Sequence, residues 1–217
     1  MTLYKLGSRG EMVKQIQRAL HLAADGIFGH ITLEAVKDFQ RTHGLKVDGV
    51  VGPATLTKLI PSMVKRSKRV ITDIIIHCTG TPEYKDITVT DLRRAHKARG
   101  FSDIGYHYVI YLDGSVHEGR NVDVIGAHCT GYNAHSIGVA YVGGMGTDGK
   151  TLTDTRNDKQ KAALLSLLVD LKKLYPKAVI KGHRDYSPDL NHNGTIEPSE
   201  WIKYCPCFFA VKEYARL

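Results

Sequence analysis

The chain has no long apolar run and no apolar leader. No segment approaches the roughly 20 consecutive apolar residues that a membrane-spanning helix requires, so we expect no membrane span. The first residues, MTLYKLGSRGEMVK, lack the apolar centre of a secretory signal peptide. We therefore expect a protein that stays in the cytoplasm until it is released, or that is exported by an unconventional route.

Cysteine is scarce: the 217 residues include four, at positions 78, 129, 205 and 207. Four cysteines allow two disulfides, but structural disulfides belong mainly to proteins of oxidising compartments. Because we expect no export signal, we expect free thiols and a metal ligand in preference to two disulfides.

Acidic residues are few in the N-terminal third. Residues 1–69 hold 12 Lys and Arg against 5 Asp and Glu, whereas residues 70–217 hold 18 against 17. The basic excess therefore lies in the first third, and the segment KRSKR at 65–69 supplies four of its charges. Such a patch attracts polyanions, namely nucleic acid, anionic lipid or anionic cell wall. The alternative is a solvated basic linker.

The N-terminal third contains an internal repeat. The sequence DGIFGHIT at 25–32 recurs 23 residues later as DGVVGPAT at 48–55. Each DG turn requires a positive φ that glycine adopts readily. Apolar residues at helical spacing precede and follow the first copy, and Thr32 is predicted to cap the second helix. A third, short helix is predicted to start near Pro53.

This pattern predicts a small all-α domain of three helices. Over about residues 5–60 it resembles the peptidoglycan-binding domain that accompanies many cell-wall hydrolases. The expected organisation is thus a peptidoglycan-binding domain at 1–60, a basic linker at 61–69 and a larger domain at 70–217.

The remainder of the chain has an α/β pattern. Apolar runs predict a buried strand at 70–76, further strands at 136–142 and 178–181, and a hairpin around the Asp113-Gly114 turn. Helices are expected at 91–99 with Thr90 as the cap, at 158–175 and in the tail at 208–217.

Two histidines and a cysteine pair stand out in this part of the chain. His77 and His183 each follow an apolar strand, and α/β folds place their sites at strand ends. Cys205 and Cys207 lie downstream in a Cys-Pro-Cys segment, and thiolate together with imidazole suits zinc. Because side chains alternate along a strand, Cys78 should point away from His77 and into the core.

Five blocks in this region together resemble the type 2 N-acetylmuramoyl-L-alanine amidases, a family that includes phage amidase-type lysozymes and peptidoglycan recognition proteins. The blocks are IIIHCTGT, DIGYHYVIYLDGSVHEGR, GAHCTGYNAHSIGVAYVGG, GHRD and KYCPCF, and they cover about residues 70–210. The resemblance implies a mixed central sheet flanked by helices, with a zinc groove on one face.

The resemblance also implies roles for individual residues. His77, His183 and Cys205 fall on the zinc ligands; Cys205, not Cys207, directly precedes the proline as the family ligand does. Tyr106 and Lys203 fall on the catalytic tyrosine and lysine. The resemblance further places two residues, His128 and Asn133, in the block that lines the substrate groove.

These residue types fit the hydrolysis of an amide bond. Two neutral imidazoles and one thiolate leave an open fourth position on zinc, where bound water has a pKa of about 7. Lys203 and Tyr106 would stabilise the oxyanion that forms when water attacks the carbonyl.

The implied reaction cleaves the bond between N-acetylmuramic acid and L-alanine in bacterial peptidoglycan. The alternative is a non-catalytic peptidoglycan receptor, although such receptors usually lack the cysteine ligand. A phage-type lysin released at lysis and a bacterial autolysin both fit. We expect a monomer, and no nucleic-acid partner, because only the N-terminal charge supports one.

A long insert separates His183 from Cys205. Residues 189–200 match the twelve-position calcium loop, with a glycine, Gly194, at the sharp turn. A helix beginning near Pro198 would then carry Lys203 and deliver Cys205. A polar loop that binds no ion is the alternative. The expected calcium ligands are Asp189, Asn191, Asn193, the Thr195 carbonyl and Glu200, with Glu197 acting through water.

Overall fold

The computed structural model describes residues 3–60 and 64–217, and the chain divides into two compact units after residue 63. Residues 1–2 of the expected N-terminal domain and 61–63 of the expected linker lie outside the described residues. No helix in the described ranges is both long and apolar enough to cross a membrane.

The first unit contains three helices, α1 (Glu11–Ala19), α2 (His30–Thr42) and α3 (Pro53–Leu59). The turns before α2 and α3 place Gly26 and Gly49 at φ values of 77° and 69°, as the DG repeats predict. A small apolar core joins the three helices, with the buried residues Val13, Ile16, Phe28, Val36, Val51 and Leu59.

A buried glutamine organises each repeated turn. The Gln17 amide nitrogen donates to the Asp25 carboxylate at 2.7 Å and to the Thr32 hydroxyl at 3.1 Å, while its oxygen accepts from the Gly26 N–H. The prediction that Thr32 caps α2 is therefore wrong: α2 begins at His30 after Gly29, and the Thr32 hydroxyl serves the turn instead.

The second turn repeats this arrangement with Gln40, which donates to Asp48 at 3.0 Å and to Thr55 at 3.1 Å. The two glutamines lie 23 residues apart, the same spacing as the DG turns, so the repeat extends into the preceding helix.

The second unit is built on a mixed five-stranded sheet of order β4-β3-β5-β1-β7. Four strands run parallel, and only the β3–β4 hairpin pairs antiparallel. A separate pair joins β2 (Thr81–Pro82) and β6 (Gly144–Met145). The strands of the main sheet are β1 (Asp73–Cys78), β3 (Tyr108–Ile110), β4 (Val116–Glu118), β5 (Ser136–Tyr141) and β7 (Val179–Gly182).

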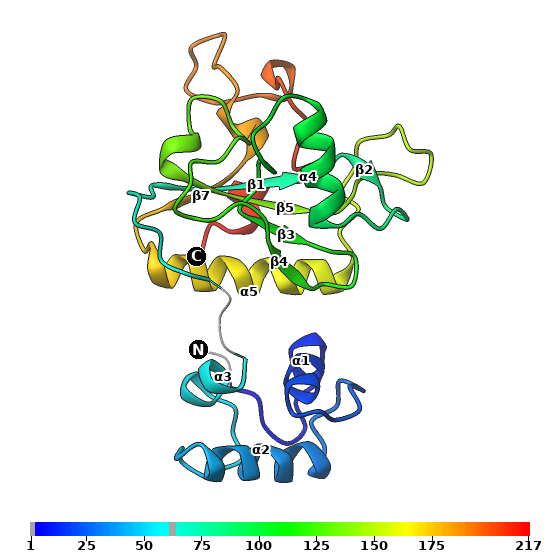
Figure 1. Ribbon diagram of the computed structural model, residues 1–217, viewed down its shortest axis with the longest axis vertical. Coiled ribbons are helices and arrows are strands. Elements are labelled where there is room, and N and C mark those ends of the chain that lie inside the picture. The colour runs from blue at the N-terminus through cyan, green and yellow to red at the C-terminus, as the bar shows by residue number, and fades with distance from the viewer. Residues whose placement is uncertain (1–2, 61–63) are drawn as a thin grey trace. The chain divides into compact units, whose positions relative to one another are not determined.

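Helices cover both faces of this sheet (Figure 1). Helix α5 (Asp158–Leu174) packs on one face and α4 (Val89–Ala98) on the other. The expected cap at Thr90 is wrong by two residues: the Thr88 hydroxyl accepts from the Asp91 N–H at 3.2 Å, and the Asp91 carboxylate accepts from the Thr88 N–H.

Side chains alternate along β1, and this places His77 and Cys78 on opposite faces of the sheet. The strand begins at Asp73, later than expected, and runs through His77 to Cys78. Cys78 belongs to the apolar cluster on the α5 side and is 7% exposed, which confirms the prediction that it is a core residue. His77 points to the opposite face of the sheet.

The end of the expected linker belongs to the second unit. The Ser67 hydroxyl donates to the Val122 carbonyl at 2.7 Å. The Arg69 guanidinium donates to several backbone carbonyls and lies 3.1 Å from His107 Nε2. Residues 67–69 are therefore held by the α/β fold, because their polar groups find partners there. Short single-turn elements complete this unit: η1 (Asn133–His135), η2 (His183–Tyr186), η3 (Pro198–Glu200) and α6 (Ala210–Glu213).

Candidate metal centre

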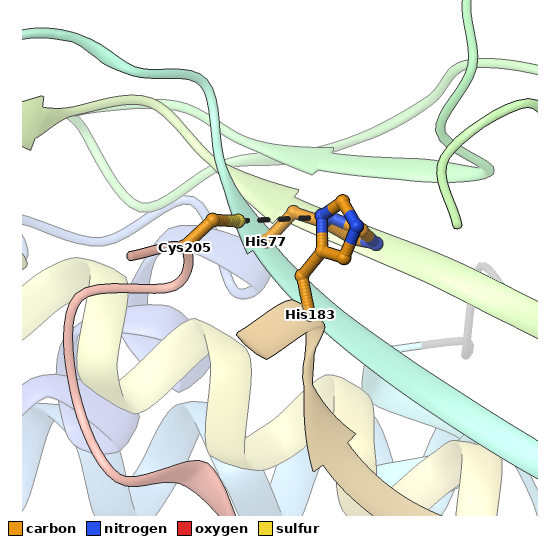
Figure 2. Close-up of side chains that lie close together, drawn as sticks. All are labelled: His77, His183 and Cys205. Atoms are coloured by element: carbon orange, nitrogen blue, oxygen red, sulfur yellow. Dashed lines mark hydrogen bonds between the residues drawn. The ribbon is translucent and has the colours of Figure 1, made fainter. Parts of the chain in front are cut away.

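Three segments far apart in the sequence meet at the sheet. His77 comes from β1, His183 opens η2 directly after β7, and Cys205 lies in the segment after η3. Figure 2 shows the three side chains converging, with the Cys205 sulfur directed at the His77 ring. Their candidate ligand atoms all lie within 4.8 Å of one another, and no other group of three such residues is found in residues 3–60 and 64–217.

The spacing within this group suits a small metal ion. The Sγ atom of Cys205 lies 3.6 Å from Nδ1 of His77. A thiolate at about 2.3 Å and an imidazole nitrogen at about 2.0–2.1 Å from one tetrahedral ion would be separated by roughly this distance. The ring centroids of His77 and His183 are 4.7 Å apart. The three residues therefore could hold a metal that accepts nitrogen and sulfur ligands.

Cys207 faces away from this group. Its sulfur lies 3.7 Å from Cys78 Sγ and 3.5 Å from the Gly144 carbonyl oxygen, on the core side of β1. The Cys205 sulfur instead accepts from the Cys78 backbone N–H at 3.2 Å. Of the two cysteines around Pro206, only Cys205 lies with the histidines.

Burial keeps these imidazoles neutral. His77 is 1% exposed, and burial together with the neighbouring His128 and His183 rings holds its pKa well below the usual value. Burial, and secondarily the Lys203 ammonium, lowers the pKa of His183 to about 4. Neutral imidazole is the form that binds a metal, so both rings are ready to do so near neutral pH.

The structure places His128 behind His77. His128 is 8% exposed, and its Nδ1 atom lies 3.1 Å from Nε2 of His77. Its other nitrogen lies 3.4 Å from the Ser136 hydroxyl. Asn133 is half-buried, and its side-chain oxygen accepts from the N–H groups of His128 and Cys129 at 2.8 and 2.9 Å. The contacts of both residues are thus with the fold around the site.

Tyr106 lies beside His77, and Lys203 precedes Cys205 by two residues. The Tyr106 ring is 5.2 Å from the His77 ring between centroids, and burial raises the pKa of its hydroxyl, as does the charge of Cys205. The Tyr106 side chain is half-buried, whereas that of Lys203 is exposed. Lys203 lies close enough to His183 for its charge to depress the pKa of that ring. A neutral phenol thus lies beside the ligand group, and the charge of the Lys203 ammonium is felt at His183.

The insert differs from its expected shape. The helix predicted from Pro198 is only the single turn η3, which ends at Glu200, so neither Lys203 nor Cys205 lies on a helix. The chain turns extended at Trp201, with φ −65° and ψ 114°, and this ends the helical turn.

The side-chain oxygen atoms of the expected calcium loop accept hydrogen bonds from within the loop. The Glu200 carboxylate accepts from the N–H groups of Leu190 and Glu197 at 2.7 and 2.8 Å. The Asp189 carboxylate accepts from the Gly194 N–H at 2.7 Å, and the Asn193 side chain accepts from the Thr195 N–H. The Asn191 side-chain oxygen accepts from the Asn193 N–H at 3.0 Å. Calcium binding stays a prediction.

Comparison with known proteins assigns both units. Residues 67–200 match the family model described as N-acetylmuramoyl-L-alanine amidase, and residues 9–59 match a putative peptidoglycan binding domain. The endolysin of Enterobacteria phage K11 is 40% identical over 128 residues, which cover 59% of this chain and 83% of that protein. The endolysin of Escherichia phage T7 is 39% identical over 126 residues, covering 58% and 83%.

Solved structures agree with this assignment. The amidase LysC from Clostridium intestinale aligns with a TM-score of 0.51 at 25% identity, covering 67% of this chain and 82% of that one. The Ph2119 endolysin from a Thermus scotoductus bacteriophage aligns with a TM-score of 0.51 at 26% identity, covering 72% and 92%. The chain belongs to the N-acetylmuramoyl-L-alanine amidase family, and it carries a peptidoglycan-binding domain at its N-terminus.

Proposed function

We propose that this amidase is zinc-dependent and hydrolyses the amide bond between N-acetylmuramic acid and the L-alanine of the stem peptide. The observation that carries the proposal is the His77, His183 and Cys205 group, with a sulfur–nitrogen separation of 3.6 Å. Two neutral imidazoles with one thiolate are a donor set that zinc favours over calcium or magnesium. When bound there, zinc would supply an activated water and polarise the scissile carbonyl.

The chain's own residues would handle the charge that develops on the substrate. Negative charge grows on the amide oxygen as water attacks the carbonyl carbon. We assign its stabilisation to the Tyr106 hydroxyl, whose ring lies beside His77, and to the Lys203 ammonium, whose charge acts on His183. The raised pKa of Tyr106 keeps its hydroxyl protonated, so it can donate a hydrogen bond throughout the reaction.

His128 acts in this proposal on His77 instead of on the substrate. Nδ1 of His77 faces the Cys205 sulfur; with a metal bound at Nδ1, Nε2 would carry the proton and donate to Nδ1 of His128. Such outer partners fix the tautomer and the orientation of a metal-binding imidazole. Asn133 supports the loop that holds His128, through its bond to the His128 N–H.

The N-terminal unit would hold the enzyme on its insoluble substrate. Residues 9–59 match a putative peptidoglycan binding domain, and residues 1–63 hold 8 Lys and Arg against 5 Asp and Glu, a net charge of +3. Tethering raises the local concentration of the catalytic unit at the wall. The relatives named endolysins come from phages, and we propose the same lytic action on the bacterial cell wall for this chain.

Mass spectrometry of digested peptidoglycan tests this proposal. We expect free stem peptides beginning with L-alanine, together with glycan strands whose muramic acid is unsubstituted. Protein purified without added zinc should contain about one zinc per chain. Fragments that retain the muramic acid–alanine bond would contradict the assigned reaction, and a metal-free but active enzyme would contradict the assigned cofactor.

A further inference from the structure

Arg184 is a buried cation that has no carboxylate partner within residues 3–60 and 64–217. It follows His183 directly in η2 and is only 3% exposed. Its Nε and Nη2 atoms are buried and have no hydrogen-bond acceptor among the residues that the structure describes. Burying an unpaired charge is unfavourable unless another interaction compensates for the lost hydration. Other groups must therefore compensate for the lost hydration of the Arg184 guanidinium.

Two aromatic rings take the place of a carboxylate. The Arg184 guanidinium carbon lies 4.0 Å from the centroid of the Trp201 ring and 4.5 Å from that of Phe209. The two rings are 5.9 Å apart and inclined by 62°. A planar guanidinium stacks well on aromatic faces, and the attraction grows when the cation is desolvated. Arg184 thus ties Trp201 to Phe209.

These two aromatic residues bracket the cysteine ligand. Trp201 stands four residues before Cys205 and Phe209 four residues after it. The Arg184 backbone N–H also donates to the Cys205 carbonyl oxygen at 2.8 Å. Arg184, which is adjacent to His183, therefore contacts this segment at three points: Trp201, the Cys205 carbonyl and Phe209.

We propose that Arg184 is a positioning residue, whose guanidinium between Trp201 and Phe209 sets the Cys205 sulfur at its distance from His77 and His183 and so determines metal affinity. This inference rests on the proposed zinc site. It assigns Arg184 no contact with substrate. Because η3 ends at Glu200, Cys205 does not lie on a helix, and contacts such as those of Arg184 and the bond from the Tyr141 hydroxyl to the Pro206 carbonyl hold its segment.

Arg156 provides a matched control. It is also a buried arginine of the same unit, 5% exposed, but it pairs with the carboxylates of Asp154 and Glu213 at 2.8 and 2.9 Å. It further donates to the Tyr214 hydroxyl at 3.1 Å and so secures the C-terminal tail. Its guanidinium carbon also lies 3.2 Å from the centroid of the Phe208 ring, so Arg156 stacks on the same segment as Arg184 but on a different ring. Because Arg156 is not adjacent to a candidate metal ligand, we expect its loss to reduce stability and to leave the zinc affinity unchanged.

The test compares Arg184→Gln and Arg184→Lys with Arg156→Gln in the full chain. The zinc dissociation constant is measured by competition with a chromophoric chelator, and thermal unfolding of the metal-free protein is measured in parallel. We expect both Arg184 variants to bind zinc about 10- to 100-fold more weakly, a usual range for residues that support metal ligands. Lysine should not rescue, since it lacks the stacking plane. Arg156→Gln should unfold at a lower temperature and keep the parental zinc affinity.

A parental zinc affinity in Arg184→Gln, or an equal loss in Arg156→Gln, would overturn the inference while leaving the zinc site intact. A parent chain that binds no zinc would refute the proposed function and this inference with it. If Arg184→Gln does not fold, Trp201→Leu removes one ring and retains the cation. It should weaken zinc binding in the same direction, and an unchanged affinity would overturn the inference.

Discussion

Nε2 of His77 lies 3.1 Å from Nδ1 of His128, so the candidate metal ligand on β1 is itself oriented by a buried histidine. His128→Ala should therefore weaken zinc binding by about 10- to 100-fold and lower kcat/KM, since the His77 ring loses its partner. Zinc competition and muramyl-peptide hydrolysis measure the two effects. His117→Ala, in the β4 strand away from the ligand group, serves as the control. Equal zinc affinity in the parent and His128→Ala would remove this role.

The two cysteines around Pro206 should behave differently. Cys205→Ser removes the thiolate that faces His77, and we expect most of the bound zinc and most of the activity to be lost. Cys207→Ser changes a sulfur that lies beside Cys78, and we expect the zinc content to be retained. Metal analysis of both purified variants checks this. Full zinc in Cys205→Ser would transfer the ligand role to another group.

Lys203 and Tyr106 should affect the reaction more than metal binding. Lys203→Ala and Tyr106→Phe each remove one group assigned to the oxyanion, which typically costs on the order of a hundredfold in kcat. Zinc content should stay near one equivalent, because neither residue belongs to the ligand group. Steady-state kinetics on a soluble muramyl peptide, with metal analysis alongside, separates the two effects. Parental kcat in both variants would argue against their catalytic assignment.

Removal of the N-terminal unit should separate wall binding from chemistry. A chain starting at Val64 keeps Ser67 and Arg69, whose hydrogen bonds belong to the α/β fold. It should cleave soluble muramyl peptides at the parental rate and lose activity on intact walls. The difference should be larger at low salt, where the net charge of +3 that is lost with residues 1–63 is least screened. Sedimentation with purified walls measures binding, and equal binding by both chains would refute the targeting role.

The loop at 189–200 carries a separate prediction, calcium binding. A calcium-selective chelator should lower both the melting temperature and the activity, and calcium but not magnesium should restore them. Zinc content is measured in the same samples, so that zinc loss is not mistaken for calcium loss. Glu200→Gln should abolish the response, whereas Asp148→Asn, in another exposed acidic turn, should retain it. A Glu200→Gln protein that responds like the parent would show that the loop binds no functional calcium.

Local patterns were sufficient for most of the architecture. The DG repeats predicted the two turns with positive φ at Gly26 and Gly49, because that backbone conformation depends on glycine itself. Strand alternation predicted that Cys78 would enter the core while His77 faced the other way. The amidase family followed from five blocks in the right order, which together span more than half of the chain.

Tertiary structure decided what depends on residues far apart in sequence. The family resemblance favoured Cys205 over Cys207, but only the packed fold gives the physical reason, since it places Cys205 beside His77 and Cys207 beside Cys78. It also placed His128 behind His77, 51 residues away. The sequence did not predict a role for Arg184 in the GHRD block, because the aromatic rings that it contacts follow a long insert. The sequence by itself determined which residue types were present for the chemistry, and long-range packing determined which of them meet.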